Sequence, residues 1–104
     1  MFIAMNRFKV KTDSVDEFEA VWKTRKSRLD EMEGFIDFKL LRGPANRDEN
    51  YTLYVSHSTW ASYDAFESWT KSQNFRDAHK QAGDTKPSYI GSPAFEGFSI
   101  VEGA

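Results

Sequence analysis

The chain has 104 residues, a net charge of −2 and no cysteine, which excludes disulfides, thiolate metal sites and cysteine nucleophiles. The length suits one domain spanning residues 1–104, and the balanced charge gives no field that would attract nucleic acid or an anionic membrane. Aromatic residues make up 15% of the chain. This is more flat apolar surface than one small core needs, which indicates a dimer interface or a pocket for a flat ligand.

Targeting and membrane segments are not expected. No apolar run reaches the length of about 18 residues that spans a bilayer. The first residues, FIAMNRFKV, lack the charged and apolar regions of a secretory signal. We therefore expect a soluble, cytoplasmic protein with neither nucleic acid nor membrane as a partner.

The first predicted element is a strand over residues 2–11, where side chains alternate between two faces. One face carries Phe2, Ala4, Asn6, Phe8 and Val10. A helix should follow, because Ser14 and Glu17 have the spacing of a capping box. Its apolar face is expected to carry Phe18, Val21, Trp22, Arg25 and Leu29. This helix should stop before Gly34.

Two strands and a second helix are predicted next. The strands cover roughly 35–42, closed by Gly43-Pro44, and 51–57, and the short polar connection between them favours an antiparallel hairpin. Thr59 is the predicted cap of a helix that runs from Trp60 to about Thr70. The inward side chains of this helix should be Trp60, Tyr63, Phe66 and Trp69.

The last third of the chain begins with a second short helix. Ser72 is its predicted cap, residues 73–82 its body and Gly83 its C-terminal stop. Residues 84–93 hold two prolines and are expected to form an irregular loop. A final strand is predicted over 94–102.

The order of these elements predicts an α+β, ferredoxin-like βαββαβ fold. It has a four-stranded antiparallel sheet with both helices on one face. The second face of such a sheet must be covered or left in water. The sheet of a second copy would cover it.

Two residues on the inner surfaces each allow two interpretations. Asn6 is either a core amide bonded to backbone or a donor that points into a cavity. His79 shares a helix face with Phe75, Ala78 and Ala82. It is either a core histidine or, because alanines leave room over the ring, an axial ligand to a planar cofactor.

Two further side chains are equally ambiguous. Trp69 either closes the core or contacts a flat ligand. Arg25 either extends its head to solvent or reaches a ligand carboxylate. For His57, at the end of a predicted strand, nothing indicates more than a surface or turn role.

Several motifs together resemble the IsdG-type haem-degrading monooxygenases of the antibiotic biosynthesis monooxygenase superfamily. They are N-R at 6–7, E-G-F at 33–35, W-x5-F-x2-W at 60, 66 and 69, and S-x2-F-x2-A-H-K at 72–80. The resemblance runs from Met1 to about Ala82 and returns in the final strand. It implies a homodimer whose two ferredoxin-like sheets join into a β-barrel, with one haem between the helices and the sheet of each subunit.

The resemblance also assigns roles to single residues. His79 matches the proximal histidine that ligates the haem iron, and Asn6 matches the distal asparagine that hydrogen-bonds the iron-bound ligand. Trp69 matches the tryptophan that forces the porphyrin out of plane. Trp22 and Arg25 match positions that border the pocket. The loop over 84–93 aligns poorly, and its role as a lid stays open.

The implied activity is that of a haem oxygenase. The enzyme would open the porphyrin ring with dioxygen and electrons from an external donor such as a reductase, and release iron. Haem would be both cofactor and substrate. The alternatives are a cofactor-independent monooxygenase acting on an aromatic or quinol substrate, a non-catalytic haem-binding dimer, and a structural dimer without a ligand.

Overall fold

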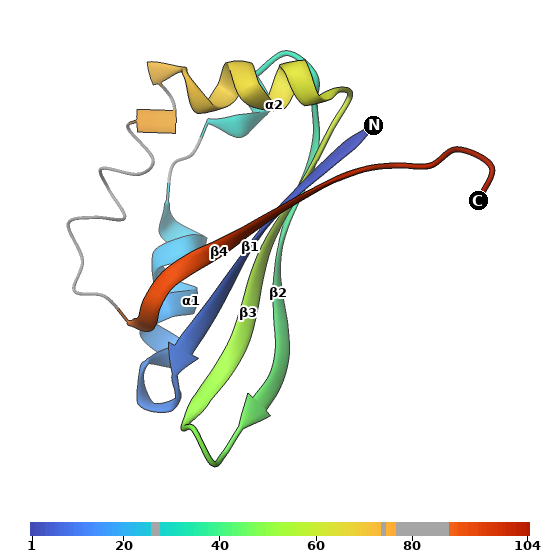
Figure 1. Ribbon diagram of the computed structural model, residues 1–104. Coiled ribbons are helices and arrows are strands. Elements are labelled where there is room, and N and C mark those ends of the chain that lie inside the picture. The colour runs from blue at the N-terminus through green and yellow to red at the C-terminus, as the bar shows by residue number, and fades with distance from the viewer. Residues whose placement is uncertain (26–27, 74, 77–87) are drawn as a thin grey trace.

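The computed structural model describes residues 1–25, 28–73, 75–76 and 88–104 (Figure 1). Its strands are β1 (Phe2–Lys11), β2 (Phe35–Asn46), β3 (Tyr51–Trp60) and β4 (Tyr89–Ser99). Its α-helices are α1 (Val15–Thr24) and α2 (Tyr63–Thr70), and short 3₁₀ turns cover Thr12–Ser14 and Leu29–Glu31. Within these ranges no helix is long and apolar enough to cross a membrane.

The strands form one sheet in the order β2-β3-β1-β4, and every neighbouring pair is antiparallel. The central strand β1 pairs Phe2 with Trp60 of β3 and with Ser99 of β4. This order is that of the ferredoxin-like split unit. The predicted α+β, ferredoxin-like class is therefore confirmed, and so is the hairpin between β2 and β3.

Both helices pack on the same face of the sheet, and the core beneath them is divided into two clusters. One cluster, under α2, consists of Phe2, Ala4, Leu29, Trp60 and Trp69. The other, under α1, consists of Phe8, Val10, Phe18 and Tyr54. The predicted inner face of the first strand is confirmed, with Asn6 between the two clusters along β1.

The first helix is shorter than its periodicity predicts, and the predicted helical position of Leu29 is wrong. The Arg25 N–H closes the last turn on the Val21 carbonyl, after which Arg25 is extended, with φ −66° and ψ 132°. Leu29 lies in a separate 3₁₀ turn and packs in the α2 cluster, not on the α1 face. The predicted capping box is also wrong. Ser14 makes no side-chain cap bond, since its backbone belongs to the preceding 3₁₀ turn.

The predicted start of the second helix is wrong by three residues. Pairing with β1 continues to Trp60, so this residue ends β3 and is fully buried there. The helix cap is Ser62, whose Oγ accepts from the Ala65 N–H at 3.1 Å, instead of Thr59. Tyr63 is 52% exposed, which contradicts its predicted inward position.

Strand ends at the sheet edges also differ from the prediction. β4 begins at Tyr89 and ends at Ser99, so residues 89–93 are strand instead of loop. β2 continues through Gly43-Pro44 to Asn46 with an irregularity in register. Both are edge strands, where a proline costs no ladder hydrogen bond on its free side. Residues 84–87 of the predicted loop lie outside the described residues.

The cap predicted at Ser72 is confirmed. Its Oγ accepts from the Phe75 N–H at 3.1 Å. The rest of the helix predicted over 73–82 and its stop at Gly83 fall mainly outside the described residues.

Gly34 explains the E-G-F motif in structural terms. Its φ of +83° is in the left-handed region, and an added Cβ would lie 2.5 Å from the Ala65 Cβ of α2. Its carbonyl accepts from the Ala61 N–H at 2.7 Å. Only glycine allows this close approach of α2 to the start of β2.

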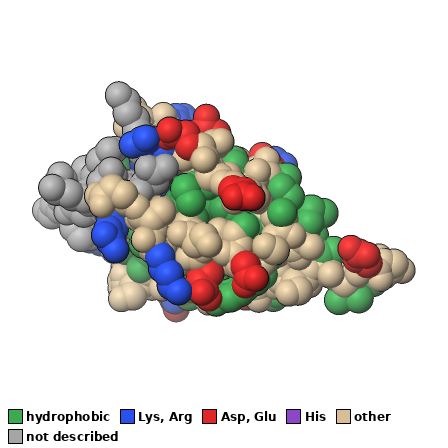
Figure 2. Space-filling view, turned by 90° about the horizontal axis from the view of Figure 1, so that it is seen from above, with side chains coloured by type: hydrophobic (Ala, Val, Ile, Leu, Met, Phe, Trp, Pro, Cys, Tyr) green, Lys and Arg blue, Asp and Glu red, His purple; other side chains and the backbone are tan. Residues whose placement is uncertain are grey.

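The outer face of the sheet carries no helix among the described elements. Apolar side chains and ion pairs alternate across it, including Arg7 with Glu96 and Lys39 with Asp37. Its larger apolar members include Ile3, Met5, Leu41, Leu53, Val55, Ile90 and Phe98. On the α2 end of the molecule, seen in Figure 2, acidic and basic side chains are interspersed with apolar surface.

Candidate functional site

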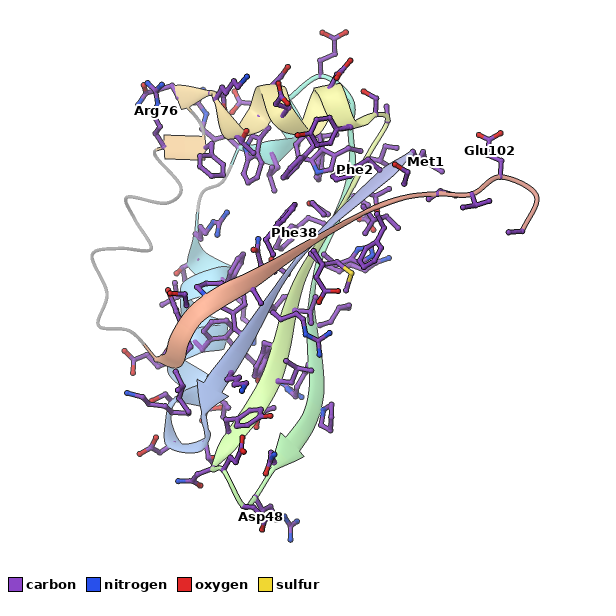
Figure 3. All side chains as sticks on the ribbon, in the orientation of Figure 1. Met1, Phe2, Phe38, Asp48, Arg76 and Glu102 are labelled. Carbon is purple, nitrogen blue, oxygen red and sulfur yellow. The ribbon has the colours of Figure 1, made fainter. Side chains whose placement is uncertain are left out.

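A cavity of about 510 Å³ lies between the two core clusters. Its floor is the inner face of the sheet, and α1, α2 and β4 contribute its walls. Figure 3 shows Phe2 near α2 and Phe38 lower on the sheet, between the levels of the two helices. The volume is in the range of pockets that hold small molecules and cofactors, about 300–1,000 Å³.

Stacked aromatic rings line this cavity. Trp22 of α1 stacks on Phe38 of β2, with ring centroids 5.7 Å apart and planes 14° apart. Phe66 of α2 stacks on Phe95 of β4 at 5.7 Å and 11°. Such pairs present flat, rigid walls. The high aromatic content therefore builds a pocket suited to a planar ligand, one of the two uses that the composition indicated.

Asn6 lies on the floor of this pocket. Its position on the inner face of β1 follows from the strict alternation of the strand. No hydrogen bond of its side-chain amide occurs within the described part of the chain. Asn6 is half-buried, and its place on the pocket floor favours the interpretation of its amide as a group directed at a ligand.

Arg25 lines the pocket and comes directly after α1. Its guanidinium is 4.4 Å from the ring centroid of Trp22, a cation–π contact. Burial lowers the pKa of Arg25, although an arginine remains charged. No carboxylate of the described residues forms an ion pair with it. This half-buried cation is suited to a ligand carboxylate.

Trp69 is both a core residue and a pocket residue, so the structure is compatible with both interpretations that the sequence allowed. It is buried in the α2 cluster, where it packs against Trp60 and meets the edge of Phe75 at 4.7 Å. It also lines the cavity. Its ring is thus held by the core on one side and forms pocket wall on the other.

Four of the five predicted site residues line this one cavity: Asn6, Trp22, Arg25 and Trp69. The fifth, His79, lies outside the described residues. His57 is on the outer face of the sheet, opposite Met5 and Lys39, and takes no part in the pocket.

Sequence reasoning missed two serines on the floor of the pocket. Ser56 and Ser58 are both buried and line the cavity. Ser58 Oγ accepts from the Trp60 indole N–H at 3.0 Å and donates to the Ala4 carbonyl at 3.4 Å. The signal was present in YTLYVSHSTW, where alternation puts Tyr54, Ser56, Ser58 and Trp60 on one face. Two small residues between large aromatics leave room for a ligand.

A polar network beside the pocket joins α1 to the sheet. Glu19 Oε2 accepts from Arg42 Nε at 3.0 Å, from Arg42 Nη2 and from the Tyr54 hydroxyl. These bonds, the one from Tyr54 first, lower the pKa of Glu19. Burial and the bond to Glu19 raise the pKa of Tyr54. A second, smaller cavity lies beside this network. Trp22 and Phe38 line this cavity and also the main one, so they separate the network from the main cavity.

Comparison with known families and proteins gives consistent matches. The profile of the family described as antibiotic biosynthesis monooxygenase matches residues 1–81. A heme oxygenase (staphylobilin-producing) of Staphylococcus saprophyticus subsp. saprophyticus is 30% identical over 88 residues, 83% of this chain and 80% of that protein. A heme-degrading monooxygenase of Listeria welshimeri is 38% identical over 56 residues, 54% of this chain but only 46% of that protein.

Two solved structures illustrate the range of proteins with this fold. The heme-degrader MhuD of Mycobacterium tuberculosis, with two hemes bound in its active site, has a TM-score of 0.75 at 22% identity and covers 100% of this chain and 99% of its own. SnoaB of Streptomyces nogalater, a cofactor-independent oxygenase, has a TM-score of 0.67 at 23% identity, with coverage of 95% and 91%. At these identities the likeness shows a shared fold.

Proposed function

Because the chain belongs to the antibiotic biosynthesis monooxygenase family, we propose that it is a haem-degrading monooxygenase. It opens the porphyrin ring with dioxygen and an external electron donor and releases iron. In this proposal residues 1–104 are one domain, which acts as a cytoplasmic homodimer with a reductase as its partner. The names of the relatives support haem as the ligand.

The observation that carries the proposal is that one aromatic pocket holds an amide and a guanidinium for which the described residues supply neither a hydrogen bond nor an ion pair. Asn6 and Arg25 line the same cavity. Haem is flat and apolar over most of its surface and carries two carboxylates at one edge. The stacked walls, the half-buried cation and the single amide on the floor match these features.

Each proposed site residue has a physical role in this scheme. Arg25 would pair with a propionate carboxylate. Trp22 and Trp69 would hold the flat macrocycle by contact with their rings. Asn6 would donate a hydrogen bond in a site where screening is weak. The role of His79 as axial ligand is proposed from its motif alone. When bound, haem supplies the redox chemistry.

Haemin titration followed by reduction tests the proposal. We expect a Soret band to form with one haemin per chain. On addition of ascorbate or a reductase under air, the band should be lost and a chelator should capture iron. A Soret band that persists unchanged, with no iron captured, would contradict the proposal.

Two histidine variants make this experiment specific. His79→Ala should change the visible spectrum of the haemin complex and abolish turnover, because it removes the proposed axial ligand. His57→Ala is the matched control, since His57 lies on the opposite face of the sheet. It should leave the spectrum unchanged.

A second function is supported by the likeness to a cofactor-independent oxygenase. In that scheme the pocket binds an aromatic or quinol substrate, and Asn6 and Trp69 position it. Oxygen uptake with a phenolic substrate, together with failure to bind haemin, would favour it. Stable haemin binding without turnover would instead indicate a non-catalytic haem-binding dimer.

A further inference from the structure

Ser56 lies beside Asn6 on the floor of the pocket. The register of β1 and β3 puts the two residues directly opposite each other, and both line the cavity. Side chains in this relation have Cβ atoms about 4.5–5.5 Å apart on the same face of the sheet. A small ligand that reaches one of them therefore reaches both.

The hydroxyl of Ser56 differs from that of its neighbour Ser58. Ser58 Oγ is used within the fold, because it bonds the Trp60 indole and the Ala4 carbonyl. Ser56 is only 7% exposed. Among the described residues its Oγ has no hydrogen-bond partner, and this oxygen is still accessible from the pocket. The side-chain amide of Asn6 likewise has no hydrogen-bond partner among the described residues, and no hydrogen bond joins Asn6 to Ser56.

The Asn6 amide and the Ser56 hydroxyl lie next to each other on the floor of the pocket, where a third atom between them could bond both. The Asn6 amide and the Ser56 hydroxyl can both donate. A single acceptor atom between them would satisfy both, as water does for many buried polar groups.

We propose that Asn6 and Ser56 form a two-point hydrogen-bonding site for an acceptor atom. In the empty pocket this atom belongs to an ordered water molecule. With haem bound, it belongs to a small ligand held between the macrocycle and the sheet. Ser56 is thus a positioning residue in addition to Asn6. The second part of this inference rests on the proposed function, while the first part does not.

The first test is a high-resolution crystal structure of the protein without haem. We expect density for one water within hydrogen-bond distance of both Asn6 Nδ2 and Ser56 Oγ. In Ser56→Val this water should be absent. An empty floor in the wild type, or an Asn6 amide turned to another partner, would overturn the inference, whatever the outcome with haemin.

The second test uses azide as the small ligand of the haemin-loaded protein, followed by absorption spectroscopy. Ser56→Ala should weaken azide binding about three- to tenfold, the effect of one lost hydrogen bond. Ser56→Thr should restore it, because the hydroxyl is kept. Ser68→Ala is the matched control, because Ser68 is exposed on α2 and does not line the cavity. It should leave azide affinity unchanged.

The outcomes separate the two proposals. If haemin binds and Ser56→Ala leaves azide affinity unchanged, the two-point site fails and haem binding stands. If haemin does not bind while the bridging water is present, haem binding fails and the two-point site stands.

Discussion

Arg25 illustrates how the residue that caps the C-terminus of a helix can become part of a binding site. The chain turns from helical to extended at this residue. Val21 and Trp22, four and three residues earlier, also line the pocket, so the helical spacing brings the guanidinium to the same place, over the Trp22 ring. The change to extended backbone at Arg25 then ends the helix.

Arg25 should strengthen the binding of ligands that carry a carboxylate. For Arg25→Gln we expect haemin to bind about tenfold more weakly, or ~1.4 kcal/mol, because one partly exposed charge-assisted contact is lost. Haemin dimethyl ester, which has no free carboxylate, should bind both proteins equally. Fluorescence quenching of the tryptophans measures both affinities.

Arg28→Gln is the matched control for this charge. Arg28 is exposed and paired with Glu31, so its loss should leave haemin affinity unchanged. An equal loss of affinity for haemin and its ester in Arg25→Gln would show that the residue acts through packing on Trp22 alone.

Single pocket residues were predictable where a simple period applies. The alternation of β1 correctly put Asn6 on the inner face between apolar neighbours. The same alternation in β3 puts Ser56 on the inner face. A serine on an inner face is compatible with core packing as well as with a binding role, so the pattern alone does not identify it as a pocket residue. Arg25 was predicted to border the pocket and does so, but the end of α1 beside it was not predictable, because neither glycine nor proline marks it.

At the scale of elements, the network of Glu19, Tyr54 and Arg42 fixes α1 on the sheet. It links one helical residue to one residue on each of two adjacent strands. Trp22, which belongs to the same helix, forms a wall of the pocket. The network therefore helps to set the position of that wall.

The stability that Glu19 contributes should depend on pH. Its bonds lower its pKa in the folded state below the ordinary value of 4.5, so the contribution is fully present above pH 4.5 and is lost as the pH falls through the folded pKa. Urea denaturation should show wild type more stable than Glu19→Gln at pH 7, with the difference closing in acid. A difference that is constant with pH would contradict this.

Tyr54→Phe provides the control for this network. It removes the bond that lowers the pKa of Glu19 most but keeps Arg42 and the carboxylate. We expect a lower free energy of unfolding at pH 7, because the carboxylate loses one hydrogen-bond donor. The double variant should lose less than the sum of the two single losses.

The order of elements was predictable, whereas their ends were not. Hydrophobic periodicity, alternating in strands and three-and-four in helices, predicted each strand and α-helix that the structure describes before Ser72. The ends are decided by tertiary pairing. Trp60 stays in β3 because Phe2 remains to be paired, and Tyr89 can join β4 because β1 offers a free edge. A local cap signal such as Thr59 does not contain this information.

At the scale of the whole molecule, the outer face of the sheet is the surface that the proposed homodimer would use. Phe98 is 48% exposed there, opposite Ile3. Leu41 and Val55 form a similar pair across β2 and β3. A row of apolar side chains with ion pairs between them is suited to a second sheet of the same kind.

We expect the protein to sediment as a homodimer at micromolar concentration. Phe98→Asp should weaken association by roughly 100-fold or more, because the interface would bury an unpaired charge. Ser68→Asp adds the same charge at an exposed position of α2 and should leave the dimer intact. A monomeric wild type, or a dimer indifferent to Phe98→Asp, would rule out assembly through this face.

The split of the core into two clusters around a cavity has a consequence for the life of the protein in a cell. A bound ligand fills the cavity and stabilises the folded state, so the ligand-free protein unfolds locally more often than the ligand-bound protein. Proteases degrade the opened form. The abundance of the protein in the cell should therefore rise and fall with the concentration of its ligand, even when the rate of protein synthesis is constant.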